Sequence, residues 1–169
     1  MSDWSSVEHL LSDWCHQASV NQEAHTRAYR HYRRMNYWLG IPVVVCTTIV
    51  GTTVFATLQQ GDNQVHPKVK IAAGVISVIS AVLASLQTFL SFGERAEKHR
   101  VVGSGYGGIL KEIEELQSLP VHLRGDVKQN VDTLREQMNA LAKESPEVPI
   151  RIHRRAQALT MKARKSLAN

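Results

Sequence analysis

The sequence predicts an all-α membrane protein, a two-transmembrane helical hairpin with an N-terminal amphipathic helix and C-terminal cytoplasmic helices. The 169-residue chain carries 20 Lys and Arg and 15 Asp and Glu, yet residues 35–61 and 71–93 contain none of these charges. Each uncharged segment is longer than the roughly 20 apolar residues that a helix needs to span a bilayer. Two core helices of a soluble bundle are the alternative, but such helices usually keep a charged stripe toward water.

Four regions follow from the distribution of charge. We expect the N-terminal helix at 1–34, the hairpin at 35–93 with spans at about 37–59 and 70–92, a cytoplasmic helical region at 94–145 and a basic tail at 146–169. In the first region, Ser5 and Glu8 have the spacing of a capping box. Four apolar residues share one face of the helix that follows: Trp4, Val7, Leu11 and Trp14. This helix would lie in the membrane interface or pack on the C-terminal helices.

Basic residues flank the hairpin on its outer sides. Four arginines precede the first span and three basic residues follow the second: Arg27, Arg30, Arg33, Arg34, Arg95, Lys98 and Arg100. The connection between the spans carries two lysines, Lys68 and Lys70, and one acid, Asp62. Because basic residues near span ends stay in the cytoplasm, we expect both termini to be cytoplasmic. Pro67 suits the first turn of the second span, where a missing N–H costs nothing.

The second span has two different faces. One face holds small and polar residues, namely Ala73, Ser77, Ser80, Ala84, Gln87 and Ser91, and the other holds Val75, Ile79, Val82, Leu86 and Phe89. Together with Thr48 and Thr52 of the first span, the small face is the candidate for pore lining or for close helix packing. Neither uncharged segment contains an Asp, Glu, His, Lys or Arg, which argues against proton relays, voltage sensors and ion-coupled carriers. A conducting protein would therefore have to oligomerise.

The cytoplasmic regions contain two further candidate surfaces. An apolar stripe of coiled-coil spacing is the candidate oligomer or partner interface: Val127, Val131, Leu134, Met138 and Leu141. This stripe would pack back on the preceding helix or associate with another chain. Six basic residues of the tail, with no acid among them, are candidates for contact with anionic lipid or nucleic acid: Arg151, Arg154, Arg155, Lys162, Arg164 and Lys165. A solvated charged tail is the third alternative.

No motif in the sequence indicates an enzyme or a cofactor. The GSGYGG segment, residues 103–108, lacks the GK[ST] of a phosphate-binding P-loop and follows no predicted strand, so we interpret it as a hinge or a close helix crossing. Eight histidines are dispersed without a metal-ligand spacing, and no nucleophile motif such as GxSxG occurs. We therefore expect no catalytic residue, no cofactor and no metal.

The hairpin resembles a known bacterial family. The stretches YRHYRRMNYWLGIPVVVCTTIVGTTVFATL and AVLASLQTFLSFGERAEKHRVVGSGYGGILKEIEEL are similar to the two halves of SLATT domains, the SMODS- and SLOG-associating two-transmembrane effectors. The resemblance covers about residues 24–119. It implies a multi-pass protein of the bacterial inner membrane. It also implies a pore-forming or membrane-perturbing effector of an antiviral defence system that ends in cell suicide.

The same resemblance suggests the partners. SLATT effectors are thought to respond to a separate nucleotidyltransferase, nucleotide sensor or reverse transcriptase, and we expect such a trigger here together with a homo-oligomer in the lipid bilayer. The alternative function is a non-conducting membrane scaffold that recruits a cytosolic partner through its C-terminal helices.

Overall fold

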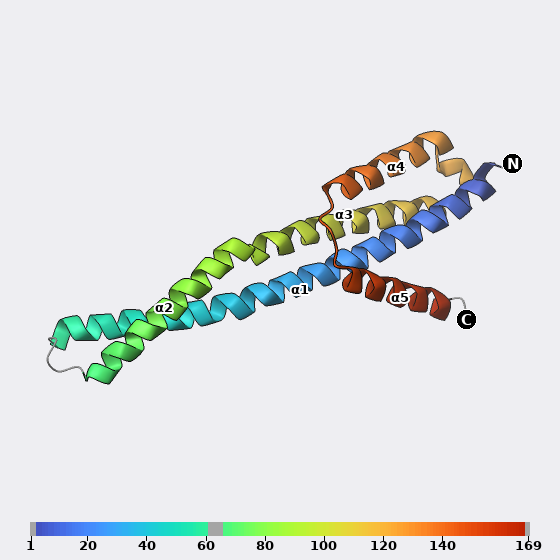
Figure 1. Ribbon diagram of the computed structural model, residues 1–169. Helices are drawn as coiled ribbons and strands as arrows, with labels where there is room; N and C mark the ends of the chain where they lie inside the picture. The colour runs from blue at the N-terminus through green and yellow to red at the C-terminus, as the bar shows by residue number, and fades with distance from the viewer. Residues whose placement is uncertain (1–2, 61–65, 168–169) are drawn as a thin grey trace. The chain divides into compact units, whose positions relative to one another are not determined.

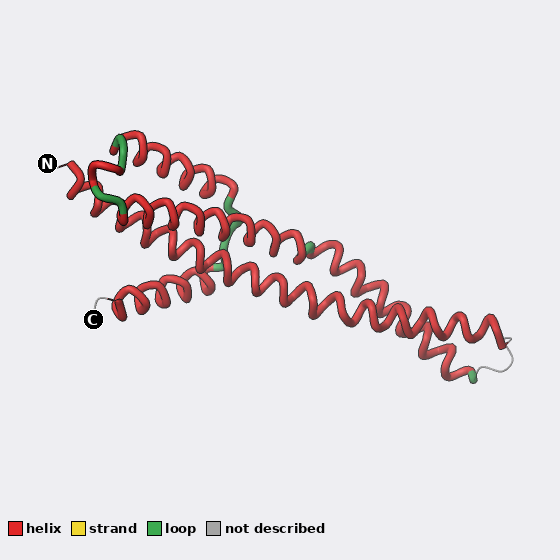
Figure 2. Tube along the Cα trace, turned by 180° about the vertical axis from the view of Figure 1, so that it is seen from behind, coloured by secondary structure: helices red, strands yellow, loops and turns green. Residues whose placement is uncertain are grey.

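The computed structural model describes residues 3–60 and 66–167, and these residues form helices joined by short loops, with no strand among them (Figures 1 and 2). In chain order the elements are α1 (Asp3–Gln60), α2 (Pro67–Leu90), α3 (Phe92–Ser118), the short 3₁₀ helix η1 (Val121–Leu123), α4 (Val127–Glu144) and α5 (Ile150–Leu167). The predicted all-helical class is confirmed. Two compact units result. The hairpin unit is Tyr32–Glu94, and the bundle unit combines the chain up to His31 with the chain from Arg95 onward.

The longest helix, α1, begins in the predicted amphipathic segment and continues through the first uncharged segment. Pro42 lies inside it. Because proline has no N–H, the carbonyl of Trp38 loses one helical hydrogen bond at this point, yet the helix goes on for more than four further turns. Residue 35 therefore marks a change in composition within one helix.

The hairpin unit pairs the second part of α1 with α2. As predicted, Pro67 stands in the first turn of α2, where the side chain of His66 accepts a hydrogen bond from the Lys68 N–H. Ser91 adopts a left-handed conformation with φ 45°, which ends α2 before α3 begins at Phe92.

Both long helical stretches contain a segment that is long and apolar enough to cross a membrane. Within the protein, 0% of the apolar segment in α1 is buried, and 6% of the apolar segment in the second helical stretch is buried. A core helix of a soluble protein would bury most of such a segment. The length, composition and exposure of these helices support association with a membrane.

The bundle unit is built on an antiparallel pair, α1 and α3 (Figure 1). As residue numbers rise along α1, the facing residues of α3 fall, from Gln22 beside Gly107 to His25 beside Gly103. Side chains from α1, α3 and α4 form the core: Leu11, Ala18, Val102, Tyr106, Ile109, Ile113 and Leu134. On α1, Leu11 and Ala18 are seven residues apart, the spacing that keeps side chains on one helix face.

The GSGYGG segment lies inside α3, so the hinge interpretation was wrong and the close-crossing interpretation is confirmed. A Cβ atom at Gly103 would lie 3.4 Å from the Cβ of His25 and 3.6 Å from the backbone nitrogen of Thr26. At Gly107 it would lie 2.7 Å from Nε2 of Gln22, and at Gly105 it would lie 2.7 Å from a methyl group of Leu141 on α4. The glycines let both neighbouring helices approach α3 closely.

A buried arginine closes the turn between α3 and α4. The guanidinium of Arg124 donates to the carbonyls of Leu119 (2.7 Å) and Gln117 (3.0 Å) and to the carboxylate of Glu8 on α1 (2.9 Å). After this turn, Asp126 caps α4 by accepting a hydrogen bond from the Gln129 N–H. The turn thereby returns α4 over the α1–α3 pair, and α5 then packs alongside α1 (Figures 1 and 2).

Candidate functional site

The small face of α2 lies largely against its own hairpin. Ser80 is 5% exposed, and Ala73, Ala84, Gln87 and Ser91 are half-buried, whereas Ser77 is exposed. The Gln87 side chain reaches α1 at Gly40, where a Cβ atom would lie 3.3 Å from its Nε2. Most residues of this predicted face are therefore buried or half-buried within the hairpin, whereas Ser77 remains exposed. The hydroxyl of Ser80 has no hydrogen-bond partner there.

The threonine hydroxyls of the first candidate span donate hydrogen bonds to backbone carbonyls of their own helix. Thr48 donates to the carbonyl of Val44 (2.8 Å), and Thr52 donates to the carbonyl of Thr48 (3.0 Å). Both side chains are exposed. Because each hydroxyl has a partner inside α1, these threonines suit contact with lipid, with another helix or with water.

The opposite face of α2 presents large apolar side chains. Its five members are all exposed, from Leu86 at 42% to Phe89 at 82%. On α1, Val44, Ile49 and Phe55 are exposed as well. Apolar surface of this extent on a monomer marks a lipid or protein contact.

An open groove lies at the end of α2 within the hairpin unit. It has a volume of about 480 Å³, and Gln87 and Ser91 of the predicted face line it together with Asn36 and Glu94. Phe92 lies beside the groove, with its ring stacked on Tyr32 at a centroid distance of 6.2 Å. The polar end of the small face therefore continues into a groove of mixed polar and apolar lining where the second span stops.

In the bundle unit, two histidines far apart in the sequence meet in the interior. The Nδ1 atoms of His25 on α1 and His99 on α3 lie 2.9 Å apart, and the two side chains are 3% and 2% exposed. The Nε2 atom of His25 lies 2.9 Å from Oγ of Ser145, at the end of α4. The ring of Tyr106 stacks on that of His25 at 6.1 Å. Three segments of the chain are thus joined by one hydrogen-bonded chain.

The short distance between the two nitrogens defines the protonation of this pair. One Nδ1 must carry the proton and the other must accept it, so the contact excludes the state in which both rings are charged. Burial, with the nearby His99 and His153, lowers the pKa of His25 from 6.5 to about 4. Burial also lowers the pKa of His99. At low pH, protonation of His25 and His99 would place positive charge in the interior of the bundle unit.

Sequence reasoning missed this pair, because the eight histidines were considered only for metal-ligand spacing. Helical periodicity was a usable signal. His25 lies seven residues after Ala18, and His99 lies seven residues before Tyr106, so both occupy the buried face of their helix. Within the described residues, no group of three or more His, Cys, Asp or Glu side chains is placed to hold a metal ion.

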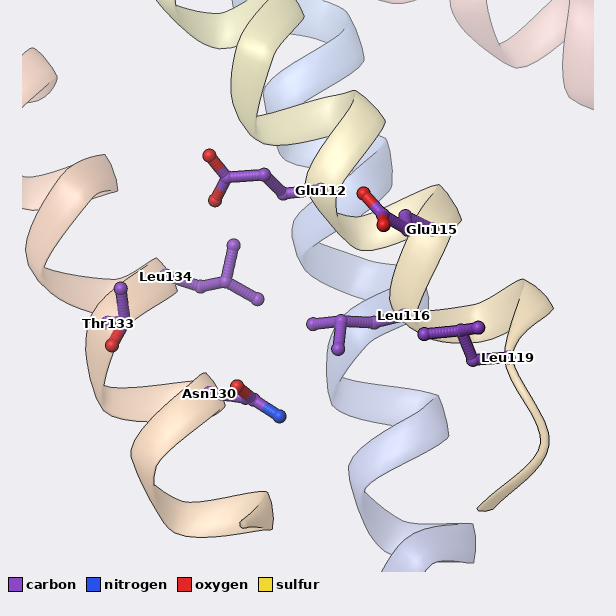
Figure 3. Close-up of a pocket in the computed structure, with 7 residues that line it drawn as sticks. All are labelled: Glu112, Glu115, Leu116, Leu119, Asn130, Thr133 and Leu134. Atoms are coloured by element: carbon purple, nitrogen blue, oxygen red, sulfur yellow. The ribbon is translucent and has the colours of Figure 1, made fainter. Parts of the chain in front are cut away.

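A cavity of about 210 Å³ lies between α3 and α4 (Figure 3). Leu116 and Leu134 point toward one another across it, and the carboxylate of Glu112 extends from α3 on its rim. Glu115, Leu119, Asn130 and Thr133 complete the lining. The lining residues include no histidine, lysine or cysteine, so the cavity offers carboxylate, amide and hydroxyl oxygens above an apolar floor.

The apolar stripe of α4 lies within the bundle unit. Leu134 is 2% exposed, and Met138 and Leu141 pack against the core that contains it. Val127 and Val131 are half-buried. Of the two interpretations of this stripe, packing back on the preceding helices is the one that the structure contains, because the glycines of α3 leave room for α4.

The six basic residues of the predicted tail all lie on α5, and all are exposed. The opposite face is the one that packs: Ala156 is fully buried, and Ile152, His153 and Thr160 are half-buried. The basic tail is therefore an ordered helix held to the bundle by a narrow apolar contact.

The comparison with protein families gives a match over the centre of the chain. Residues 20–103 match DUF4231, a family described as a protein of unknown function. The DUF4231 segment includes the whole hairpin unit, both histidines of the buried pair and Gly103. The comparisons with curated proteins and with solved structures gave no match.

Proposed function

We propose that this protein is an oligomeric effector that makes the inner membrane of a bacterium permeable during antiviral defence, triggered by a separate nucleotide- or nucleic-acid-linked partner. The observation that carries the proposal is the pair of uncharged segments in α1 and α2, whose large apolar side chains are exposed. The resemblance of residues 24–119 to SLATT domains supplies the biological role.

The arrangement of polar residues supports an assembly of several copies. One copy has two candidate spans, and two helices cannot enclose a channel. The small face of α2 uses Ser80 and Gln87 within its own hairpin but leaves Ser77 exposed, and the threonines of α1 are exposed too. Small and hydroxylated residues of this kind favour close contact with helices of further copies or the lining of an aqueous path.

The mechanism follows from the residues that the spans lack. Without an Asp, Glu, His, Lys or Arg in residues 35–61 and 71–93, the path would have little ion selectivity and would close by drying of an apolar constriction. The bundle unit would hold the closed assembly. A trigger that binds the open assembly more tightly would shift the population toward it.

Leakage from vesicles tests this proposal. The full-length protein, reconstituted into vesicles loaded with a self-quenching dye, should release the dye when the protein encoded beside it and that protein's activating nucleotide are added. Ser77→Leu should reduce dye release, because it replaces the exposed small polar side chain of this face with a large apolar one. The buried Ser80 is left unchanged. Val75→Leu, on the large apolar face, is the matched control and should leak as the wild type does.

Two measurements separate the outcomes. Cross-linking in the same vesicles reports whether an oligomer is present, and flotation reports whether the protein is inserted. An inserted oligomer that releases no dye under triggering conditions would refute the proposed function. The scaffold alternative depended in part on the α4 stripe, which packs internally here, so we do not carry it further.

A further inference from the structure

The outer face of α5 combines five basic residues in a narrow sector. An α-helix turns by about 100° per residue, and this rotation places five of the six basic side chains of α5 within a sector of about 100° around the helix axis. These five residues are Arg151, Arg154, Arg155, Lys162 and Lys165. We name this the α5 basic face. The buried Ala156 lies on the opposite side of the helix, so the α5 basic face points away from the bundle core.

The surroundings of the α5 basic face contain no compensating acid within the helix. α5 has no Asp or Glu, and its basic side chains are exposed. Its edges are apolar: Ile150 and Met161 on one side are 66% and 54% exposed, and Leu159 on the other is 40% exposed. A sector of positive charge bordered by exposed aliphatic side chains matches the boundary between phosphate headgroups and acyl chains.

The same features distinguish a lipid surface from nucleic acid. Proteins that bind single strands stack bases on aromatic side chains, and α5 contains no Phe, Tyr or Trp. Duplex binding depends on phosphate contacts but gains nothing from exposed Ile150, Leu159 and Met161. The aliphatic edges thus favour a surface that is both anionic and partly apolar.

Because α5 belongs to the same chain as the two candidate spans, insertion of the spans would keep α5 near the membrane. The basic flanks predict that the bundle unit lies on the cytoplasmic side, where the leaflet surface is negative. Because the helix is tethered, even weak contacts to headgroups would be occupied for much of the time. We propose that the α5 basic face binds anionic phospholipid headgroups of the membrane in which the hairpin lies, an inference that rests on the membrane placement in the proposed function but not on conduction.

Thiol accessibility in nanodiscs tests this inference. Ala158 lies at the centre of the α5 basic face and is exposed, so Ala158→Cys places a reporter there. In the full-length protein, a water-soluble maleimide should modify this thiol about tenfold more slowly in phosphatidylglycerol-containing nanodiscs than in phosphatidylcholine alone, and high salt should remove the difference. Mass spectrometry separates this site from Cys15 and Cys46.

Charge variants supply the control. Arg154→Glu with Lys162→Glu, added to the reporter, should abolish the dependence on phosphatidylglycerol, and the milder Arg154→Gln with Lys162→Gln should weaken it. Lys111→Glu with Lys128→Glu changes as much charge on exposed positions of α3 and α4 and should leave the protection intact. Circular dichroism confirms that each variant keeps its helices.

Each outcome decides between the alternatives. Equal modification in both lipids, in protein that is inserted by flotation, would overturn the lipid inference while leaving the proposed pore untouched. Protection by added duplex or single-stranded nucleic acid in phosphatidylcholine, without protection by phosphatidylglycerol, would overturn it in favour of nucleic acid. Failure of the protein to enter nanodiscs at all would refute the membrane placement on which both proposals depend.

Discussion

The Nδ1 atoms of His25 and His99 lie 2.9 Å apart in the interior of the bundle unit, joining residues separated by 74 positions in the sequence. Since only one proton fits between the two nitrogens, the contact is lost when both rings are protonated. Ser145 extends the contact to the end of α4 through Nε2 of His25. The order of the C-terminal helices is therefore linked to the protonation of one buried pair.

The first prediction concerns pH. In the unfolded chain each histidine takes up a proton near pH 6.5, whereas in the folded unit His25 stays neutral down to about pH 4. The stability that these neutral rings contribute is thus complete above pH 6.5 and is lost as the pH falls from 6.5 toward 4, by about 3 kcal/mol at most for His25. Thermal unfolding of the detergent-solubilised protein across this range measures it.

A matched variant identifies the source of that loss. His25→Gln with His99→Gln should flatten the dependence between pH 6.5 and 4, while the exposed His122→Gln should keep it. An unchanged pH dependence in the double variant would show that other groups are responsible.

The second prediction concerns Ser145. Ser145→Ala removes the partner of His25 Nε2 and should cost about 1–3 kcal/mol, the usual penalty for an unpaired buried polar group. It should also raise amide hydrogen exchange at the start of α5, because the link that precedes this helix is lost. Ser118→Ala removes an exposed hydroxyl bonded only within its own turn and is the control. Equal exchange in the two variants would contradict a role for Ser145.

The third prediction concerns Arg124, which bonds to two carbonyls and to Glu8 from a position that is 9% exposed. Arg124→Ala should destabilise the bundle unit by about 2–4 kcal/mol, since it leaves the Leu119 and Gln117 carbonyls unpaired. Chemical denaturation followed by tryptophan fluorescence measures the loss. Arg100→Ala breaks an exposed ion pair with Glu97 and should change stability little. Comparable losses in the two variants would show that burial of Arg124 is unimportant.

The fourth prediction tests the close crossing at the GSGYGG segment. Gly103→Leu should destabilise the bundle unit by about 1–3 kcal/mol or prevent its folding, because the side chain meets His25 and the backbone of Thr26. A Cβ atom at Gly108 would have no neighbour within 4 Å outside its own helix backbone, so Gly108→Ala should stabilise α3 by up to about 1 kcal/mol. Melting temperatures of both variants are the measurement, and a stable Gly103→Leu protein would refute the crossing.

Much of the fold was predictable because its signals are local. The two uncharged segments, the two faces of α2 and the basic face of α5 depend on residue spacing along one helix, and helix geometry converts spacing directly into faces. Even the burial of His25 and His99 was available in principle, since both follow the seven-residue spacing of their apolar neighbours.

The sequence by itself thus determined the helical class, the candidate spans and the distribution of charge, because charge and periodicity are properties of neighbouring residues. Only the tertiary structure decided which faces meet. It placed Leu134 inside the bundle, brought Gly103 against α1 and joined His25 to His99 and Ser145. These contacts link residues distant in the sequence, and they arise when glycine-lined helices pack closely enough for their buried side chains to touch.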